Sequence, residues 1–409
     1  MIFRSLIYMS VILGLAFVSC ANVQRGSPAA AESSGGAIHS DSPSVVRRTR
    51  QVESHLVKAG STVWKASTTR VDGTGNLRVL EFLDNAQGWT ASDDGDLYKT
   101  LDGGTTWARI NLDNPARAQV VGVSFVSSTV GWVVLQRRAN RVLDYESNQF
   151  WLLHTTDGGL TWLHQHKDNA EITQLAFANQ NEGWLVGMKW SRKEKFGQSY
   201  FVLHTIDRGQ HWDDLSEKLN ELVVGKDDLV QDLFTDLHTA SPGEAILLSQ
   251  HGRIFRTTDS GVKWQQIAAI ENEPPQTCIC DIGVTADKGI WAAGGAYSIE
   301  GTWGMFSRAK TDELVTYTLP GIYFSGLILL SDTELLASGL IPVEKNAALV
   351  HGRTEGVVLY SLDGGYHWAI VYRDATIKAI NALASLDADH ISAVGDRGLV
   401  LRLERRLEK

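Results

Sequence analysis

Short apolar segments separated by polar turns recur along most of the chain. In the clearest stretch, an apolar segment at 172–178 leads through a turn to a second at 183–187, and a third follows at 200–205. Apolar runs of this length that are bounded by turn residues are typical of β-strands. One short helix is expected around Leu215 to Val223. The pattern therefore predicts an all-β chain.

One phrase, Ser/Thr-x-Asp-x-Gly-x-x-Trp, follows the third apolar segment in five places, and its copies mostly lie 50 to 55 residues apart. In a tight turn the carboxylate accepts hydrogen bonds from backbone amides, Gly permits a positive φ, and Trp packs beneath the turn. This is the Asp-box (BNR-type) phrase, whose role is structural. The fourth and fifth copies lie about twice as far apart as the others, which indicates that an intervening copy has lost the phrase near residue 311. The box residues are Asp102 and Trp107, Asp157 and Trp162, Asp207 and Trp212, Asp259 and Trp264, and Asp363 and Trp368.

A second phrase, an apolar run that enters Gly-Trp or a variant of it, marks another strand in each unit and brings the number of units to seven. Four short strands at a period of about 50 residues are the signature of a β-propeller blade. The seventh unit lacks its last strand, which the segment around Trp64 can supply. We therefore predict a seven-bladed β-propeller over residues 58–409, with the ring closed by pairing of the N- and C-terminal strands.

The N-terminus has the features of an export signal. Residues 1–19 contain one early positive charge and an apolar run too short to cross a bilayer, which predicts a signal peptide. The segment from Phe17 to Cys20 resembles a lipobox, so Cys20 is expected to carry a lipid, with plain secretion as the alternative. Residues 20–57 are rich in Ser, Gly and Ala and predict a flexible tether. An extracytoplasmic, membrane-anchored protein is expected, in the periplasm or at the outer membrane.

Charge and composition exclude some functions. The 409 residues carry 38 Lys and Arg against 47 Asp and Glu, a net charge of −9, which argues against nucleic-acid binding. No arrangement typical of a metal site, a cofactor site or a catalytic triad stands out, so neither metal nor cofactor is expected. Cys278 and Cys280 are one residue apart in a predicted strand, which favours buried thiols over a strained bridge.

Loop insertions point to a binding surface. Four units carry long insertions between their second and third strands, on the face opposite the Asp-boxes. Insertions on one face of a repeat protein are where such proteins usually bind a partner. Two adjacent insertions are basic, which suits a charged protein surface, although ordinary solvated loops are the alternative. The candidate binding residues are Arg137, Arg138, Arg141, Lys189, Trp190, Arg192, Lys193 and Lys195.

The lipobox, the Ser-rich tether and the seven units that run from Gly-Trp to the Asp phrase together resemble the photosystem II stability/assembly factor family. The resemblance implies a non-enzymatic propeller, on the thylakoid lumen side, that binds a membrane-protein complex or its assembly intermediate. A monomer is expected. The Asp-box also occurs in bacterial neuraminidases, so a secreted sialidase-like glycoside hydrolase is one alternative. However, Arg78 is not followed by the Ile-Pro that this enzyme family usually has. A cell-surface adhesion module is the other alternative.

Overall fold

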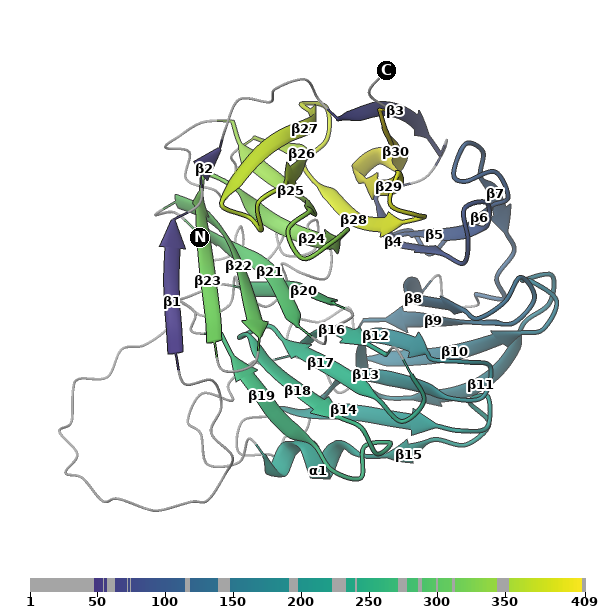
Figure 1. Ribbon diagram of the computed structural model, residues 1–409. Helices are drawn as coiled ribbons and strands as arrows, with labels where there is room; N and C mark the ends of the chain where they lie inside the picture. The colour runs from purple at the N-terminus through teal and green to yellow at the C-terminus, as the bar shows by residue number, and fades with distance from the viewer. Residues whose placement is uncertain are drawn as a thin grey trace, which may run out of the picture.

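The computed structural model describes residues 48–53, 55–56, 63–71, 73, 75–114, 118–138, 148–190, 198–222, 233–239, 241–270, 278–285, 289–298, 301–310, 313–343 and 353–406. Seven small sheets surround a common axis (Figure 1). The inner strand of each sheet contacts the inner strands of the sheets before and after it, and the last contacts the first. The predicted seven-bladed β-propeller is therefore confirmed.

The first four blades each contain four antiparallel strands that follow one another along the chain, from the inner strand to the rim. Blade 1 contains β4 (Leu77–Phe82), β5 (Gly88–Ser92), β6 (Leu97–Thr100) and β7 (Ala108–Ile110); blade 2 contains β8 (Gln119–Phe125), β9 (Gly131–Arg137), β10 (Gln149–Thr155) and β11 (Leu163–Asp168); blade 3 contains β12 (Glu171–Phe177), β13 (Gly183–Trp190), β14 (Gln198–Thr205) and β15 (Asp213–Asp214); blade 4 contains β16 (Phe234–His238), β17 (Ala245–Ser249), β18 (Arg253–Thr257) and β19 (Gln265–Ala269).

A helix, α1 (Ser216–Glu221), follows blade 3 and confirms the helix expected there. Its Leu219 is fully buried in the core of blades 3 and 4. Among the residues that the structure describes, no helix is long and apolar enough to cross a membrane.

Blades 5 and 6 each gain a fifth strand from the N-terminal segment. Blade 5 contains β20 (Cys278–Val284), β21 (Ile290–Ser298), β22 (Gly301–Lys310) and β23 (Glu313–Pro320), and blade 6 contains β24 (Tyr323–Leu329), β25 (Leu335–Pro342), β26 (Thr354–Ser361) and β27 (His367–Asp374). The strands β1 (Arg48–Glu53) and β2 (His55–Leu56) pair in parallel with β23 and β27 (Figure 1). The sheet-forming part of the chain therefore begins before residue 58, within the range assigned above to the tether. The remaining tether and Cys20 lie outside the described residues.

Blade 7 is assembled from both ends of the propeller. Its strands are β28 (Ile380–Ser385), β29 (His390–Gly395) and β30 (Leu399–Arg405), with a short 3₁₀ turn, η3 (Asp396–Gly398), before the last. The outer strand is β3 (Trp64–Arg70), which pairs antiparallel with β30 along its whole length. The predicted closure by the two chain ends is confirmed.

The same β-bulge interrupts all seven inner strands near their starts. In each strand the register against the second strand skips one residue. A bulge redirects the side chain of the extra residue, and these residues line the central cavity of the ring. They are Arg78, Val121, Thr173, Thr235, Cys280, Ser325 and Asn381.

Aromatic stacking joins neighbouring blades. The buried Trp89 of β5 stacks on Phe125 of β8 with ring centroids 3.7 Å apart, and Trp132 of β9 stacks on Phe177 of β12 at 3.5 Å. Such pairs contribute about 0.5–1.5 kcal/mol beyond the burial of their area. The excess of Trp in the sequence thus supplies the packing between blades.

Candidate functional site

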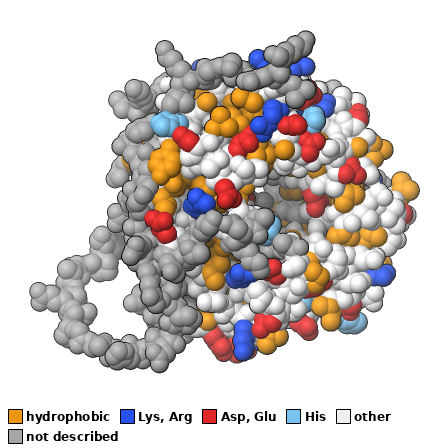
Figure 2. Space-filling view, in the orientation of Figure 1, with side chains coloured by type: hydrophobic (Ala, Val, Ile, Leu, Met, Phe, Trp, Pro, Cys, Tyr) orange, Lys and Arg blue, Asp and Glu red, His pale blue; other side chains and the backbone are white. Residues whose placement is uncertain are grey.

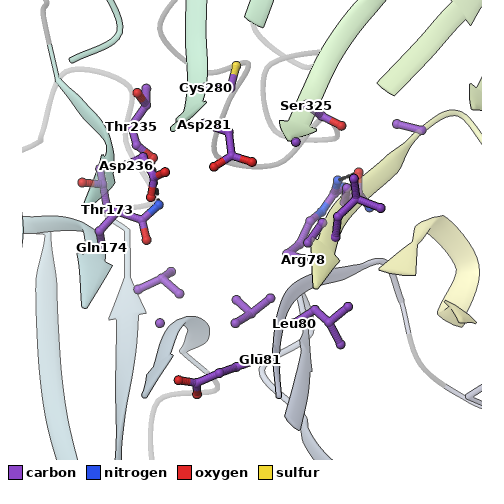
Figure 3. A pocket seen from close by; sticks show the side chains of 18 of the residues that line it. Arg78, Leu80, Glu81, Thr173, Gln174, Thr235, Asp236, Cys280, Asp281 and Ser325 are labelled. Atoms are coloured by element: carbon purple, nitrogen blue, oxygen red, sulfur yellow. Dashed lines mark hydrogen bonds between the residues drawn. The ribbon is translucent and has the colours of Figure 1, made fainter. Parts of the chain in front are cut away.

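The inner strands enclose a central cavity of about 380 Å³. Figure 3 looks into it, with Asp236 and Gln174 on one side and Arg78 on the other. The wall combines polar bulge residues with the side chains that follow them in the strands. This cavity is one candidate place for a ligand or partner, and the basic insertion face is another.

A ring of side-chain to backbone hydrogen bonds surrounds the cavity. At every junction between blades, a side chain on one inner strand bonds to the backbone of the next inner strand, always in the same rotational direction. Net contributions of about 1 kcal/mol are typical for one such bond. In ring order, the bonds join Glu81 to the Phe125 amide (3.1 Å), Ser124 to the Phe177 amide (3.1 Å), Gln174 to the Thr235 carbonyl (2.8 Å), Asp236 to the Ile282 amide (2.8 Å), Asp281 to the Leu327 amide (2.6 Å), Ser325 to the Ile380 carbonyl (2.6 Å) and Asn381 to the Leu77 carbonyl (2.9 Å).

Two carboxyl groups of this ring hold protons unusually strongly. Burial raises the pKa of Glu81 to about 8, although the amide of Phe125 acts in the opposite direction. Burial and the neighbouring Asp236 raise the pKa of Asp281 well above its usual range. Protonated carboxyl groups retain an oxygen that accepts the amide hydrogen. The cavity wall is therefore less negative at neutral pH than its three acidic side chains suggest.

The Arg78 side chain is held by its neighbours at the junction of blades 1 and 7. Its guanidinium donates to the Asn381 side chain at 2.7 Å and lies 3.6 Å from both Asp93 and Asp396. Arg78 and Asn381 are thus engaged in joining blades 1 and 7.

The basic insertion face includes Arg137, the last residue of β9. Its guanidinium lies over the ring of Trp151 of β10, 5.8 Å from the centroid, and donates to the side chain of Gln149 at 2.5 Å. The ammonium of Lys167 of β11 lies 5.3 Å from the same ring. Trp151 and Lys167 are direct partners in the β10–β11 register. Two cations therefore flank one partly buried indole at the insertion end of blade 2, a pair we call the Trp151 cations.

Two other predicted binding residues form ion pairs that join blades 2 and 3. Arg138 lies 2.8 Å from Glu171 of β12, which also accepts a hydrogen bond from Asn148. Lys189 of β13 lies 2.8 Å from Asp168 of β11, with its ammonium 4.2 Å from the ring of Phe201. Because each cation already has an anionic partner, these residues contribute to the contact between blades.

The remaining predicted binding residues cannot be placed. Arg141, Arg192, Lys193 and Lys195 lie outside the described residues, as does the side chain of Trp190. The sequence reasoning did not single out Trp151 and Lys167. The sequence could have indicated them only through strand pairing, because the alignment of β9, β10 and β11 places Trp151 and Lys167 beside Arg137.

The Asp-box aspartates occupy five equivalent turns between third and fourth strands. In every turn Oδ1 accepts from the backbone amide four residues later, at 2.8–2.9 Å, and from the Thr or Ser hydroxyl two residues earlier, at 2.8–3.1 Å. The second Gly of the first box, Gly104, has a φ of +86°, and the indole of Trp107 donates to its carbonyl at 3.2 Å. In the described part of the fifth blade, Ser307 keeps the hydroxyl position and contacts Thr316 instead.

In none of the described ranges do three or more His, Cys, Asp or Glu side chains gather as they would to hold a metal ion. Acidic and basic side chains are interspersed on the face shown in Figure 2.

Comparison with known proteins agrees with the seven-bladed propeller fold. The family described as photosynthesis system II assembly factor YCF48 matches residues 145–274. The photosystem II assembly lipoprotein Ycf48 of Synechococcus sp. (strain CC9902) is 22% identical over 330 residues, which cover 72% of this chain and 87% of that protein. The chloroplastic photosystem II stability/assembly factor HCF136 of Arabidopsis thaliana is 26% identical over 180 residues, which cover 42% of this chain and 38% of that protein. A solved structure of YCF48 bound to a D1 peptide has a TM-score of 0.58 at 19% identity, covering 86% of this chain and 100% of that one.

By its fold, then, the chain is a closed seven-bladed β-propeller. Its similarity is to the photosystem II stability/assembly factors, and the resemblance expected from the repeat phrases is confirmed. The named relatives are assembly factors rather than enzymes.

Proposed function

We propose that this protein is a non-enzymatic scaffold that binds a protein subunit during assembly of a membrane complex, of the kind represented by photosystem II. The similarity to assembly factors over 87% of the length of the Synechococcus relative supports an assembly role. The D1 peptide in the solved YCF48 structure supports a protein partner, and specifically a peptide segment such as that of D1.

The observation that carries the proposed binding surface is the pair of cations on Trp151. Arg137 and Lys167 both lie within 6 Å of the indole centroid, and neither is among the ion pairs found with described carboxylates. Cations on an aromatic ring can receive carboxylates of a partner, while the ring adds apolar contact area. Arg141, Lys189, Trp190, Arg192, Lys193 and Lys195 extend the proposed surface along the adjoining insertions.

A labelled D1 peptide titrated against the purified chain tests this proposal by fluorescence anisotropy. The double substitution Arg137→Glu and Lys167→Glu should weaken binding about tenfold or more, which corresponds to about 1.4 kcal/mol. The matched control is Lys263→Glu, an exposed lysine in an Asp-box turn on the opposite face, and it should bind as the unmodified chain does. Equal affinity of the double variant would refute the proposed surface.

We further propose that Cys20 anchors the chain by a lipid on the extracytoplasmic side of the membrane. The lipobox-like segment supports this, as does the lipoprotein named among the relatives. The substitution Cys20→Ala should move the chain from the membrane fraction to the soluble extracytoplasmic fraction. A Cys20→Ala chain that stayed in the membrane fraction would contradict the anchor.

A further inference from the structure

The two cysteines of blade 5 lie at the bulge of its inner strand, β20. In the register with β21, Ile279 pairs with Gly294 and Asp281 pairs with Ala293, so Cys280 between them has no partner residue. The Sγ atoms of Cys278 and Cys280 are 3.7 Å apart. A disulfide bond is about 2.0 Å long, so closing one requires the two sulfurs to approach by about 1.7 Å.

The two thiols differ in access. Cys280 is partly exposed and lines the central cavity, whereas Cys278 is buried behind it. The hydroxyl of Tyr323, on the inner strand of blade 6, lies 2.8 Å from the sulfur of Cys280. At this distance the hydroxyl and the sulfur share a hydrogen bond between blades 5 and 6. One accessible sulfur with a buried sulfur beside it is the arrangement of an attacking and a resolving cysteine.

We propose that Cys278 and Cys280 form a reversible redox site in the wall of the central cavity, which low-molecular-weight disulfides oxidise to an intrastrand disulfide. This inference rests on the geometry of β20 and is independent of the proposed assembly role.

The reaction balances as two thiol–disulfide exchanges. The Cys280 thiolate attacks one sulfur of oxidised glutathione, forms a mixed disulfide and releases one glutathione thiolate, which takes up the proton that Cys280 lost. The Cys278 thiolate then attacks Sγ of Cys280 and releases the second glutathione, which takes up the proton from Cys278. The protein loses two protons and two electrons, equivalent to two hydrogen atoms, and oxidised glutathione gains them.

Oxidation also changes the contact between blades 5 and 6. Disulfide formation removes the S–H hydrogen of Cys280, so this sulfur can no longer donate to the Tyr323 hydroxyl. A disulfide between cysteines that are separated by one residue closes a small, strained covalent ring. Because of this strain, the bond should be readily reduced again. The site would therefore respond to the redox state of its compartment.

The test uses the full-length chain with Cys20→Ala, so that Cys278 and Cys280 are its only two cysteines. The folded protein is incubated with oxidised glutathione, and its thiols and intact mass are then measured. We expect both thiols to disappear with a mass loss of two hydrogens and no retained glutathione, and dithiothreitol to restore them. With Cys278→Ala, Cys280 should instead retain one glutathione as a stable mixed disulfide.

The control variant is Cys280→Ser, which removes the accessible sulfur but keeps a hydrogen-bonding group beside Tyr323. Its Cys278 should remain unmodified in the folded chain, and both variants are compared by circular dichroism to show that they fold. Two unmodified thiols in the parent chain, or glutathione retained on it without bridge formation, would overturn the proposal.

Discussion

The guanidinium of Arg405 lies over the indole ring of Trp64, 5.0 Å from its centroid, and the two residues are direct partners in the register of β3 and β30. Trp64 is 2% exposed and meets the ring of Tyr360 edge to face at 5.8 Å. Arg405 also pairs with Asp389 at 3.0 Å and with Glu334. Residues from the two ends of the propeller thus clamp blade 7 against blade 6.

Removal of this clamp should destabilise the whole ring. The substitution Trp64→Ala deletes a fully buried indole and the contact with Arg405, and losses of about 3–5 kcal/mol are typical for such changes. The unfolding midpoint in urea should fall accordingly. The neighbouring Lys65→Ala removes an exposed side chain from the same strand, and its effect should stay within about 0.5 kcal/mol. Similar midpoints for the two variants would show that β3 does not close the ring.

The carboxyl groups of the central ring predict a loss of stability with rising pH. Folding raises the pKa of Glu81 from 4.5 to about 8, so between these values the folded chain keeps a proton that the unfolded chain releases. The free energy of unfolding must therefore decrease as the pH rises through this window. The expected decrease between about pH 5 and about pH 9 is on the order of 4 kcal/mol, measured by urea unfolding.

The variant Glu81→Gln isolates this effect. Its side-chain oxygen can still accept the Phe125 amide hydrogen, but the group no longer titrates. Above about pH 5, the free energy of unfolding of this variant should depend less steeply on pH than that of the parent chain. We assign the remaining dependence to Asp281. An unchanged slope in Glu81→Gln would contradict the proposed proton on Glu81.

The Asp-box turns predict the opposite dependence in acid. Although burial acts to raise it, the pKa of Asp102 is lowered by hydrogen bonds from Thr106 and Thr100. A lowered pKa contributes stability that is present above the unfolded value of 3.8 and is lost as the pH falls. At neutral pH, Asp102→Ala should cost about 1 kcal/mol, whereas Asp94→Ala, an exposed acid in a nearby turn, should cost little. Equal effects of the two substitutions in thermal melts would remove the structural role of the box.

The two arginines at the end of β9 should behave differently. Arg138→Ala leaves the largely buried Glu171 without its ion-pair partner, and the expected cost is about 1–3 kcal/mol. Arg137→Ala should alter stability by less than about 0.5 kcal/mol, since it removes an exposed side chain from the edge of Trp151. Chemical denaturation of the two variants checks this contrast, and a larger loss for Arg137→Ala would reverse the assigned roles.

Most of the fold could be predicted because each blade leaves its own local pattern. The Asp phrase needs only contacts within one turn, and the missing strand of blade 7 was identified because the ring requires one. The strands β1 and β2 were not predicted, since RTRQVE has no apolar alternation and pairs through its backbone.

The site could be predicted only in part because its contacts join segments distant in sequence. The bond from Asp281 to the Leu327 amide depends on the placement of two blades. Similarly, the net charge of the insertions omitted Glu171 and Asp168, which lie outside them and pair with Arg138 and Lys189. The Trp151 cations required knowledge of the strand register.

The most direct test of the proposed role is the anisotropy titration of the labelled D1 peptide against three chains: the parent, Arg137→Glu with Lys167→Glu, and Lys263→Glu. The account predicts saturable binding by the parent and the Lys263→Glu chain, and affinity at least about tenfold weaker for the double variant. Absence of saturable binding by the folded parent chain would contradict a role with this partner. Equal binding by all three chains would contradict the surface at Trp151.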